Sequence, residues 1–159
     1  MKKIFWIIGM LLVLAACTHP SPPQTRTTPL PSIPTDTFQP TGHVLVDATT
    51  KYIDYNDADF KKAVDEGRVI YLEFSAAWCP ECQRLGPIIR SSIETLNDPA
   101  VVGFKVDYDT GKELERQYNV IYQHTHIILA RDGSISWKSM KSEWDDALFQ
   151  QELKKAEAS

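Results

Sequence analysis

A predicted strand runs directly into a predicted helix near residue 79, and this junction constrains the fold more than any other feature. Residues 69–74 are rich in β-branched and aromatic side chains, which is typical of a buried strand. Two cysteines, Cys79 and Cys82, follow it one helical turn apart, directly behind Trp78. After them, apolar side chains recur at helical spacings of three, four and seven, at Leu85, Ile88, Ile89, Ile93 and Leu96.

The start of this helix gives the two cysteines different chemistry. Cys79 meets the unpaired N–H groups and the positive end of the helix dipole, which favour a thiolate, so we expect it to be the attacking thiol. Pro80 suits the first helical position because its missing N–H leaves no bond unmade. Cys82 lies deeper and is expected to resolve the mixed disulfide, so the pair forms a disulfide that is made and broken.

A structural disulfide and a zinc site are the two alternatives to redox chemistry for the cysteine pair. A structural disulfide between Cys79 and Cys82 would close a loop of only two intervening residues and would constrain little chain. A zinc knuckle shares the Cys-x-x-Cys spacing, but the sequence holds no second pair of this kind. Redox chemistry is therefore the favoured interpretation.

The N-terminus has the pattern of an export signal. Two lysines precede an apolar run over residues 4–14, which ends in Leu-Ala-Ala-Cys at 14–17. This pattern predicts a signal peptide over residues 1–16, because a membrane-spanning helix needs about twenty apolar residues. The segment resembles a bacterial lipobox, which implies that Cys17 becomes the lipidated first residue of the mature chain. A plain signal peptide with an incidental cysteine and an uncleaved anchor are the alternatives.

The lipobox also resolves the cysteine count and the charge. Three cysteines in an exported protein leave one thiol over, unless Cys17 carries lipid. Thr18 stands where aspartate would signal inner-membrane retention, so the resemblance favours the outer membrane, facing the periplasm. Removing residues 1–16 removes two lysines and takes the net charge from −4 to −6. This negative net charge leaves no basic patch that would bind nucleic acid.

Prolines separate the export signal from the folded part. Seven of the ten prolines lie between residues 18 and 42, with threonine and serine among them. Such a composition predicts an extended tether over residues 17–43, with an ordered extension packed on the domain as the alternative. The remaining residues, 44–159, are expected to form one domain.

Strand and helix patterns alternate through this domain. The order β-α-β-α-β-α-β-β-α predicts an α/β fold with a central mixed sheet of four to five strands and helices on both faces. The pattern beyond the cysteine junction consists of strands at 44–46, 101–106, 125–129 and 135–137, a helix capped by Asn56 or Asp57, a helix capped by Asp109 or Thr110, a hairpin turn at 131–134 and a helix from about Glu143.

From about residue 52 the chain resembles the thioredoxin-fold disulfide oxidoreductases, especially exported members. The resemblance implies a thiol–disulfide oxidoreductase that works through its dithiol and has no cofactor. It rests on Phe74, the Trp-Cys-x-x-Cys run at 78–82, Pro87, Val106-Asp107, Tyr118-Asn119-Val120 and Arg131-Asp132-Gly133.

The resemblance assigns roles around the dithiol. Glu73 takes the place of a buried acid beneath the second cysteine, which implies that it moves the proton of Cys82 and has a raised pKa through desolvation. A glutamate in a salt bridge at the sheet edge is the alternative. Glu81 places a negative charge near Cys79, which disfavours the thiolate, lowers the reduction potential and favours a reductase. Trp78 is expected to cover the site.

His124 and Thr125 stand where the family usually has a cis-proline followed by threonine. A cis peptide without proline costs about 2.5–4 kcal/mol, so we expect a trans bond before His124. Its imidazole is expected near Cys79, where it stabilises the thiolate, hydrogen-bonds substrate, or ligates a metal with both sulfurs. A neutral side chain that only fills the space is the alternative.

Together these patterns predict a monomeric, lipid-anchored, extracytoplasmic reductase of oxidised client proteins, supplied with electrons by a membrane thiol-electron donor. A thiol oxidase or isomerase would run the same chemistry in reverse. A metallochaperone would use Cys79, Cys82 and His124 as ligands.

Overall fold

A computed structural model describes residue 30 and residues 32–159 of the chain. The predicted signal peptide over residues 1–16 and the predicted lipidation site Cys17 lie outside the described residues. Among the helices that the structure describes, none is long and apolar enough to cross a membrane.

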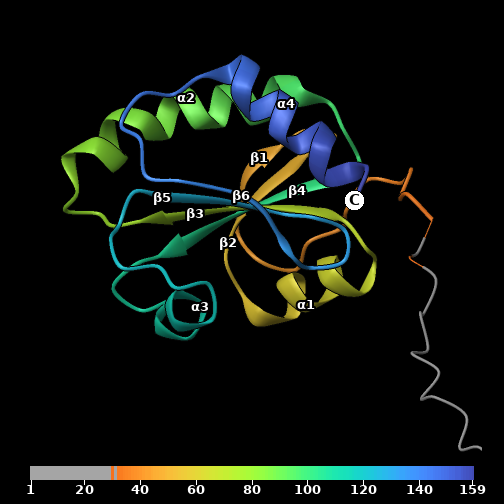
Figure 1. Cartoon of the computed structure of the whole chain (residues 1–159), viewed down its shortest axis with the longest axis horizontal. Helices are drawn as coiled ribbons and strands as arrows, with labels where there is room; N and C mark the ends of the chain where they lie inside the picture. The colour runs from red at the N-terminus through yellow and green to blue at the C-terminus, as the bar shows by residue number, and fades with distance from the viewer. Residues whose placement is uncertain (1–29, 31) are drawn as a thin grey trace, which may run out of the picture.

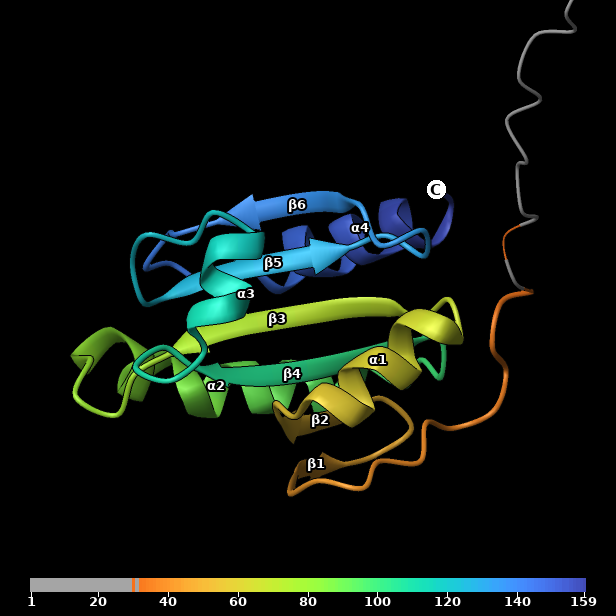
Figure 2. The same cartoon turned by 90° about the horizontal axis from the view of Figure 1, so that it is seen from below.

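A six-stranded mixed sheet forms the centre of the domain (Figures 1 and 2). The strand order is β1-β2-β4-β3-β5-β6. The β2–β4 and β4–β3 pairs are parallel, and the other three pairs are antiparallel. The predicted mixed sheet is confirmed, but it has six strands instead of four to five. They are β1 (Val44–Asp47), β2 (Lys51–Asp54), β3 (Val69–Ser75), β4 (Val101–Asp107), β5 (Thr125–Leu129) and β6 (Ile135–Ser139).

The strand missing from the prediction is β2. Its four residues are too few to show an alternating pattern, and only the central Tyr52 and Ile53 are buried. Its strand structure comes from tertiary pairing, with β1 on one side and β4 on the other. This pairing brings Tyr52 level with Gly103 of β4.

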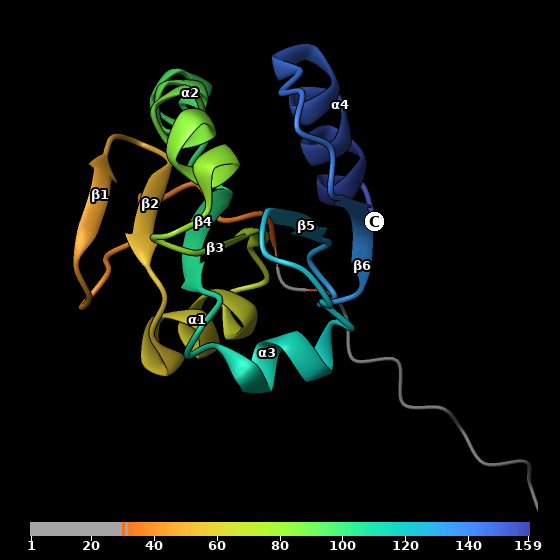
Figure 3. The ribbon, with the colours of Figure 1, turned by 90° about the vertical axis from the view of Figure 1, so that its left-hand side faces the viewer.

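Helices cover both faces of the sheet, as predicted (Figure 3). Helices α1 (Asp57–Asp65) and α3 (Lys112–Gln117) lie on one face, and α2 (Pro80–Leu96) and α4 (Asp146–Glu157) lie on the other. Each face has its own apolar core. The predicted cap of α1 is confirmed, since the Asn56 side chain accepts a hydrogen bond from the N–H of Asp59.

Two predicted helix starts are wrong. Helix α3 starts after Gly111 with no side-chain cap, because Asp107 instead accepts from the N–H groups of Asp109 and Thr110. Helix α4 begins at Asp146 instead of about residue 143, because the Asp145 carboxylate caps it.

Strand β3 lies near the middle of the sheet and is buried at all seven positions. Side chains alternate between the two faces of a strand. Val69 and Tyr71 belong to the core beneath α2 and α4, so Glu73 and Ser75 face the same side. Two polar side chains therefore lie in the interior on the face that α2 covers.

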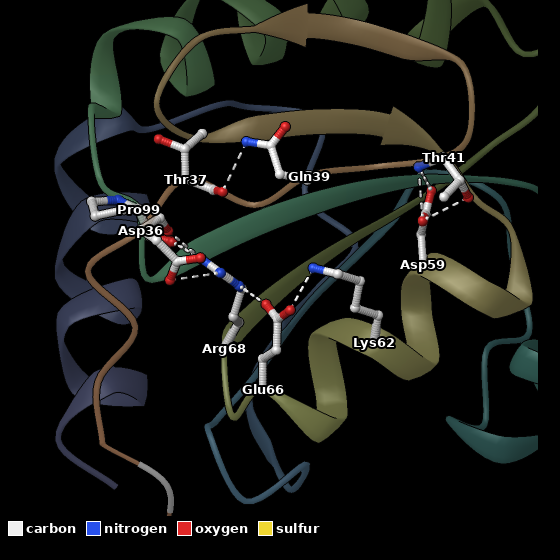
Figure 4. A network of polar contacts seen from close by, with 9 residues as sticks. All are labelled: Asp36, Thr37, Gln39, Thr41, Asp59, Lys62, Glu66, Arg68 and Pro99. Carbon is white, nitrogen blue, oxygen red and sulfur yellow. Dashed lines mark hydrogen bonds and ion pairs between the residues drawn. The ribbon is translucent and has the colours of Figure 1, made fainter.

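The segment before β1 packs against the domain (Figure 4). Phe38 is fully buried in the core shared with α1 and α3. Arg68, 1% exposed, donates to the backbone carbonyls of Asp36 and Pro99. The Asp59 carboxylate accepts from the N–H groups of Thr41 and Gly42 at 2.9–3.0 Å.

These contacts correct the predicted boundary at residue 44. Residues 36–42 belong to the packed unit, so this part of the predicted tether 17–43 is an ordered extension. Burial alone would raise the pKa of Asp59, but hydrogen bonds from Asn56, Thr41 and Gly42 lower it. The ionised carboxylate thus holds the segment through charge-assisted hydrogen bonds.

Replacing Phe38 tests whether this segment belongs to the core. Phe38→Ala should lower the free energy of unfolding by about 3–5 kcal/mol, because it removes a fully buried aromatic side chain. Ile33→Ala is the matched control, since Ile33 is 52% exposed and its loss should cost less than about 0.5 kcal/mol. Urea denaturation measures both, and equal effects of the two substitutions would contradict the packed extension.

Candidate active site

The two cysteines occupy the first turn of α2, at the end of β3. Cys79 is the N-cap residue of α2, and its Sγ accepts a hydrogen bond from the N–H of Cys82 at 3.2 Å. Pro80 takes the first helical position, where a backbone N–H would have no partner within the helix, so its missing N–H costs no hydrogen bond. A hydrogen bond to sulfur and the helix N-terminus both favour negative charge on Cys79. Both thiols are free and nearly buried.

Cys82 has the opposite electrostatic environment. Burial raises the pKa of its thiol to about 11, and the hydrogen bond and charge of Cys79 add to this effect. Hydrogen bonds with Ala76 and Ser75 lower that pKa in part. Cys82 is therefore protonated at neutral pH and has to lose its proton before it attacks a disulfide.

Glu73 supplies a buried carboxyl group on the same side of the sheet. It is 2% exposed, and burial raises its pKa. Hydrogen bonds from Tyr52 and Ser75 and the charges of Lys105 and His124 lower that pKa in part. The predicted buried position is therefore observed, and Glu73 is not an edge residue in a salt bridge. Its role in proton transfer stays a prediction.

A row of polar side chains crosses the sheet at the level of Glu73. The strand register aligns Glu73 with Lys105 of β4 and with His126 of β5. The same register extends the row to Asp54 on β2 and to Ser139 on β6. In this row the charge of Lys105 lies close enough to lower the pKa of the Glu73 carboxyl, whereas His126 is neutral.

His124 directly precedes β5, and its ring contacts the connection between β6 and α4. Its N–H donates to the Phe74 carbonyl at 2.7 Å, and its φ of 63° lies in the left-handed region. Its Nε2–H donates to the Lys141 carbonyl at 2.8 Å, and its ring meets that of His126 edge-on, with centroids 5.0 Å apart. The ring is thus held toward the β6–α4 connection, and its electrostatic effect falls on Glu73.

The structure also answers two predictions that concern His124. No peptide bond is cis in the part of the chain that the structure describes, so the bond before His124 is trans, as expected. Among residues 30 and 32–159, no group of three or more His, Cys, Asp or Glu side chains is placed to hold a metal ion. The described residues therefore do not bring Cys79, Cys82 and His124 together as a ligand set.

His126 is a buried, neutral core residue. Burial lowers its pKa to about 3, and the charge of His124 adds to the effect. Its ring stacks on Tyr71, whose hydroxyl lies 2.8 Å from Nδ1. Its Nε2 has no hydrogen-bond partner among the described residues. It lines a cavity of about 110 Å³ with Trp144 and Phe149.

The charge of Glu81 is compensated by a neighbour. Its carboxylate pairs with Arg84 one turn along α2, at 2.7 and 3.0 Å. The opposite charge of Arg84 reduces the negative field that Glu81 exerts at Cys79. The predicted effect of Glu81 on the reduction potential is therefore weaker than its own charge implies.

Exposed apolar side chains surround the dithiol. Trp78 is 57% exposed and donates from Nε1 to Asp109 at 2.9 Å, so its indole is held at the surface next to Cys79. Ile121 and Tyr122 are each 61% exposed. They belong to the loop that Tyr108, packed against the cysteines, holds by a hydrogen bond to the Ile121 carbonyl.

Thr125, predicted as a residue that binds substrate or tunes the site, lies in the interior. It is fully buried, and its hydroxyl donates to the Tyr122 carbonyl at 2.7 Å. This hydrogen bond ties the loop that contains Tyr122 to the start of β5.

A cleft of about 620 Å³ opens at the carboxyl ends of β2, β3 and β4. Ser75 and Lys105 line it, together with Ala77 of the loop that leads to Cys79. The polar row around Glu73 therefore reaches solvent through Ser75 and Lys105.

A comparison with protein-family models matches residues 51–155 to thioredoxin. The chain belongs to the thioredoxin family. This range contains all eight site residues that the sequence indicates around the Cys-x-x-Cys motif, which are Glu73, Trp78, Cys79, Pro80, Glu81, Cys82, His124 and Thr125. Within this family, the chain is a thiol–disulfide oxidoreductase.

Curated thioredoxins are similar in sequence. A "Thioredoxin H-type" of Oryza sativa subsp. indica is 32% identical over 90 residues, which cover 57% of this chain and 71% of that protein. A "Protein disulfide isomerase-like 2-3" of Oryza sativa subsp. japonica is 34% identical over 77 residues, which cover 48% of this chain and 17% of that protein. The similarity to the isomerase thus concerns one part of a much longer chain.

Solved structures show the same thioredoxin fold. Trxlp from Edwardsiella tarda EIB202 is 27% identical, with a TM-score of 0.53 over 63% of this chain and 96% of that chain. The thioredoxin of Malassezia sympodialis has a TM-score of 0.56 over 73% of this chain and 97% of that chain, at 20% identity. The thioredoxin fold predicted from the sequence is confirmed.

Sequence analysis missed the polar residues that surround Glu73. The sequence could indicate Ser75, because it follows the predicted strand over 69–74 directly and lies two positions after Glu73, which places both on one face where the strand continues. Lys105 likewise lies in a predicted strand. The sequence around Tyr52 gives no such indication, because its four-residue strand is too short to show a strand pattern.

The raised pKa of Glu73 predicts a pH-dependent loss of stability. The folded state holds this proton more tightly than the unfolded chain, whose glutamate pKa is about 4.3. The stabilisation is therefore complete below that pH and is lost as the pH rises through the folded-state pKa. Glu73→Gln should raise the free energy of unfolding at pH 8 by about 1–3 kcal/mol, with little effect near pH 4.

Urea denaturation at the two pH values measures this difference. Glu94→Gln, at an exposed position on α2, is the matched control and should change stability equally at both. A Glu73→Gln effect that does not grow with pH would contradict the buried, proton-binding carboxyl.

Proposed function

We propose that this protein is a lipid-anchored, extracytoplasmic reductase of protein disulfides. The observation that carries the proposal is the arrangement at the start of α2. There the N-cap Cys79 accepts a hydrogen bond at sulfur, and a protonated Cys82 lies one turn away on the side of the buried Glu73. An attacking thiolate, a resolving thiol and a proton acceptor are the parts that thiol–disulfide exchange requires.

The proposed reaction has two steps. The Cys79 thiolate attacks a client disulfide, forms a mixed disulfide and releases one client thiolate, which takes up a proton. Cys82 then loses its proton and attacks the Cys79 sulfur, which releases the second client thiolate. Two electrons pass from the dithiol to the client, and the enzyme is left with a Cys79–Cys82 disulfide.

The electrostatics of the dithiol favour reduction of clients. Strong thiol oxidants owe their potential to a stabilised reduced form. Here burial destabilises the thiolate of Cys82, whose pKa is raised to about 11. A reduced form without strong thiolate stabilisation gives up its electrons more readily, which supports a reductase.

The surface around the dithiol suits an extended protein segment as substrate. The exposed side chains of Trp78, Ile121 and Tyr122 offer apolar contact area next to Cys79. Oxidised client proteins whose disulfides lie in accessible, partly unfolded segments match such a surface. The acidic balance of the chain gives no support to nucleic acid as a partner.

The proposed anchor is a lipid on Cys17. Between Cys17 and the first packed residue, Asp36, the chain spans at most about 70 Å when fully extended. A domain held at this reach would work on proteins near the membrane surface. Because the periplasm has no thiol buffer that keeps such a dithiol reduced, a membrane thiol-electron donor is the proposed source of electrons.

Reduction of insulin disulfides tests the proposed activity. The full chain carrying Cys17→Ser should catalyse this reduction with dithiothreitol as electron source. Cys79→Ser and Cys82→Ser, each added to that chain, should lower turnover at least about a hundredfold, because each removes one of the two reacting sulfurs. Turnover that survives either substitution would contradict a two-thiol mechanism.

Lipid labelling in a two-membrane bacterium tests the proposed anchor. Cells that express the full chain with a labelled fatty acid should yield labelled protein in the membrane fraction. Cys17→Ser should yield unlabelled protein, because the acceptor thiol is gone. Label that persists in Cys17→Ser, or a parent chain without label, would contradict anchoring through Cys17.

A further inference from the structure

We propose that the cavity of about 110 Å³ between β6 and the start of α4 binds a carboxamide group, presented by an asparagine or glutamine side chain of a client protein. Binding of the amide itself involves no redox step. The client as source of the amide rests on the proposed function, because a client reaches this surface only when its disulfide is reduced.

His126 gives the cavity an unmet hydrogen-bond donor. Its side chain lines the cavity and is 2% exposed. Its Nδ1 lies 2.8 Å from the hydroxyl of Tyr71, which keeps its proton because burial raises the pKa of Tyr71 well above its usual value. A buried hydroxyl donates to a partner, and here Nδ1 is that acceptor. The proton of the neutral imidazole therefore lies on Nε2, which has no partner among the described residues.

Aromatic rings form the apolar part of the cavity lining. The ring of Trp144 lies 5.5 Å from that of His126 and 4.8 Å from that of Phe149, measured between centroids. The indole N–H of Trp144 donates to the Ser92 hydroxyl, so it is not available to a ligand. Trp137 of β6 also lines the cavity. Such a surface suits a planar group that carries a hydrogen-bond acceptor for His126.

Acidic side chains line the exposed part of the cavity. Glu143 and Asp145 are both exposed residues of its lining, with Lys141 as the one basic residue beside them. A carboxamide offers an oxygen to the N–H of His126 and two N–H donors to a carboxylate. An ammonium or guanidinium group has donors only and would leave His126 unmet, whereas a carboxylate ligand would be repelled by the acidic residues.

The size of the cavity limits the ligand to a small group. A cavity of about 150 Å³ holds a benzene molecule, so 110 Å³ holds a group of about four or five heavy atoms. The side chains of asparagine and glutamine are of this size. The same volume has room for about three water molecules, which the amide would displace.

Two hydrogen bonds place the mouth of the cavity beside the dithiol. The carbonyl of Lys141 accepts from Nε2 of His124, and the carbonyl of Ser142 accepts from Arg84 of α2. Arg84 follows Cys82 by two positions in the sequence. The connection that borders the cavity is therefore held between the first turns of α2 and the residue that precedes β5. A client whose disulfide reaches the cysteines thus passes close to this mouth.

Titration with propionamide tests the site in the full chain carrying Cys17→Ser. Proton–nitrogen NMR spectra should show the His126 proton on Nε2, and propionamide should shift this resonance with an affinity in the millimolar range. Propionate and ethylammonium should bind at least about tenfold more weakly, because each leaves a polar group of the site unpaired. A proton on Nδ1, tighter binding of ethylammonium, or no response to propionamide, as for a cavity that holds water only, would each overturn the proposal.

Two substitutions locate the bound amide. His126→Phe keeps a flat ring but removes the N–H, so propionamide should bind at least about fivefold more weakly. Ser139→Leu fills the cavity from β6 with His126 intact and should weaken binding at least about tenfold. Ser91→Leu, at an exposed position outside the lining, is the matched control and should bind as the parent chain does. Unchanged affinity in Ser139→Leu would overturn the site even if His126→Phe does not fold.

Reduction of disulfide-linked peptides tests the client as source of the amide. Pairs of peptides would differ only in glutamine or leucine at one position, which is moved along the chain on either side of the disulfide. At one position glutamine should lower KM at least about threefold without changing kcat, and Ser139→Leu should abolish this preference. Equal KM values at every position, with propionamide bound, would overturn the client as source. Failure of the parent chain to reduce insulin would overturn the proposed function, while the propionamide titration still decides whether the site exists.

Discussion

The structure depends most on the burial of the Glu73 carboxyl beneath the dithiol. A carboxyl group inside a protein is costly unless hydrogen bonds compensate for lost water. Tyr52 and Ser75 provide these bonds, and Lys105 and His124 provide opposing charge. The cost that remains appears as the raised pKa of Glu73. The same group that weakens the fold at high pH binds a proton more tightly than an exposed glutamate does.

The sheet brings the parts of the site together from distant segments. Strand β3 ends at the loop before Cys79, β4 adds Lys105, and β5 begins beside β3 at His124. Helix α2 then closes the face on which Glu73 and Ser75 lie. The dithiol and the buried Glu73 thus come from one continuous strand–helix unit, whereas Tyr52, Lys105 and His124, which lower the pKa of Glu73, come from β2, β4 and the residue before β5. The two reacting cysteines are therefore neighbours in the sequence, whereas the residues that shift the pKa of Glu73 are brought close to it only by the fold.

This division explains how much the sequence predicted. The strand over 69–74 and the helix after Cys79 follow from periodicity, and the buried position of Glu73 follows from family resemblance. Tyr52 escaped notice because a four-residue strand shows no pattern and is formed by its neighbours. The burial of residues 36–42 was missed because one aromatic residue, Phe38, anchors an otherwise polar, proline-rich segment. The direction of the His124 ring depends on the Lys141 carbonyl, seventeen residues away.

The equilibrium reduction potential of the Cys79–Cys82 pair tests the central claim most directly. The full chain carrying Cys17→Ser would be equilibrated in dithiothreitol buffers of graded composition, and the fraction of free thiols measured after alkylation. A dithiol whose buried Cys82 resists ionisation should have a potential close to that of thioredoxin, about −270 mV. A value close to that of a strong periplasmic oxidant, about −120 mV, would contradict a reductase and show that the site runs in the oxidising direction.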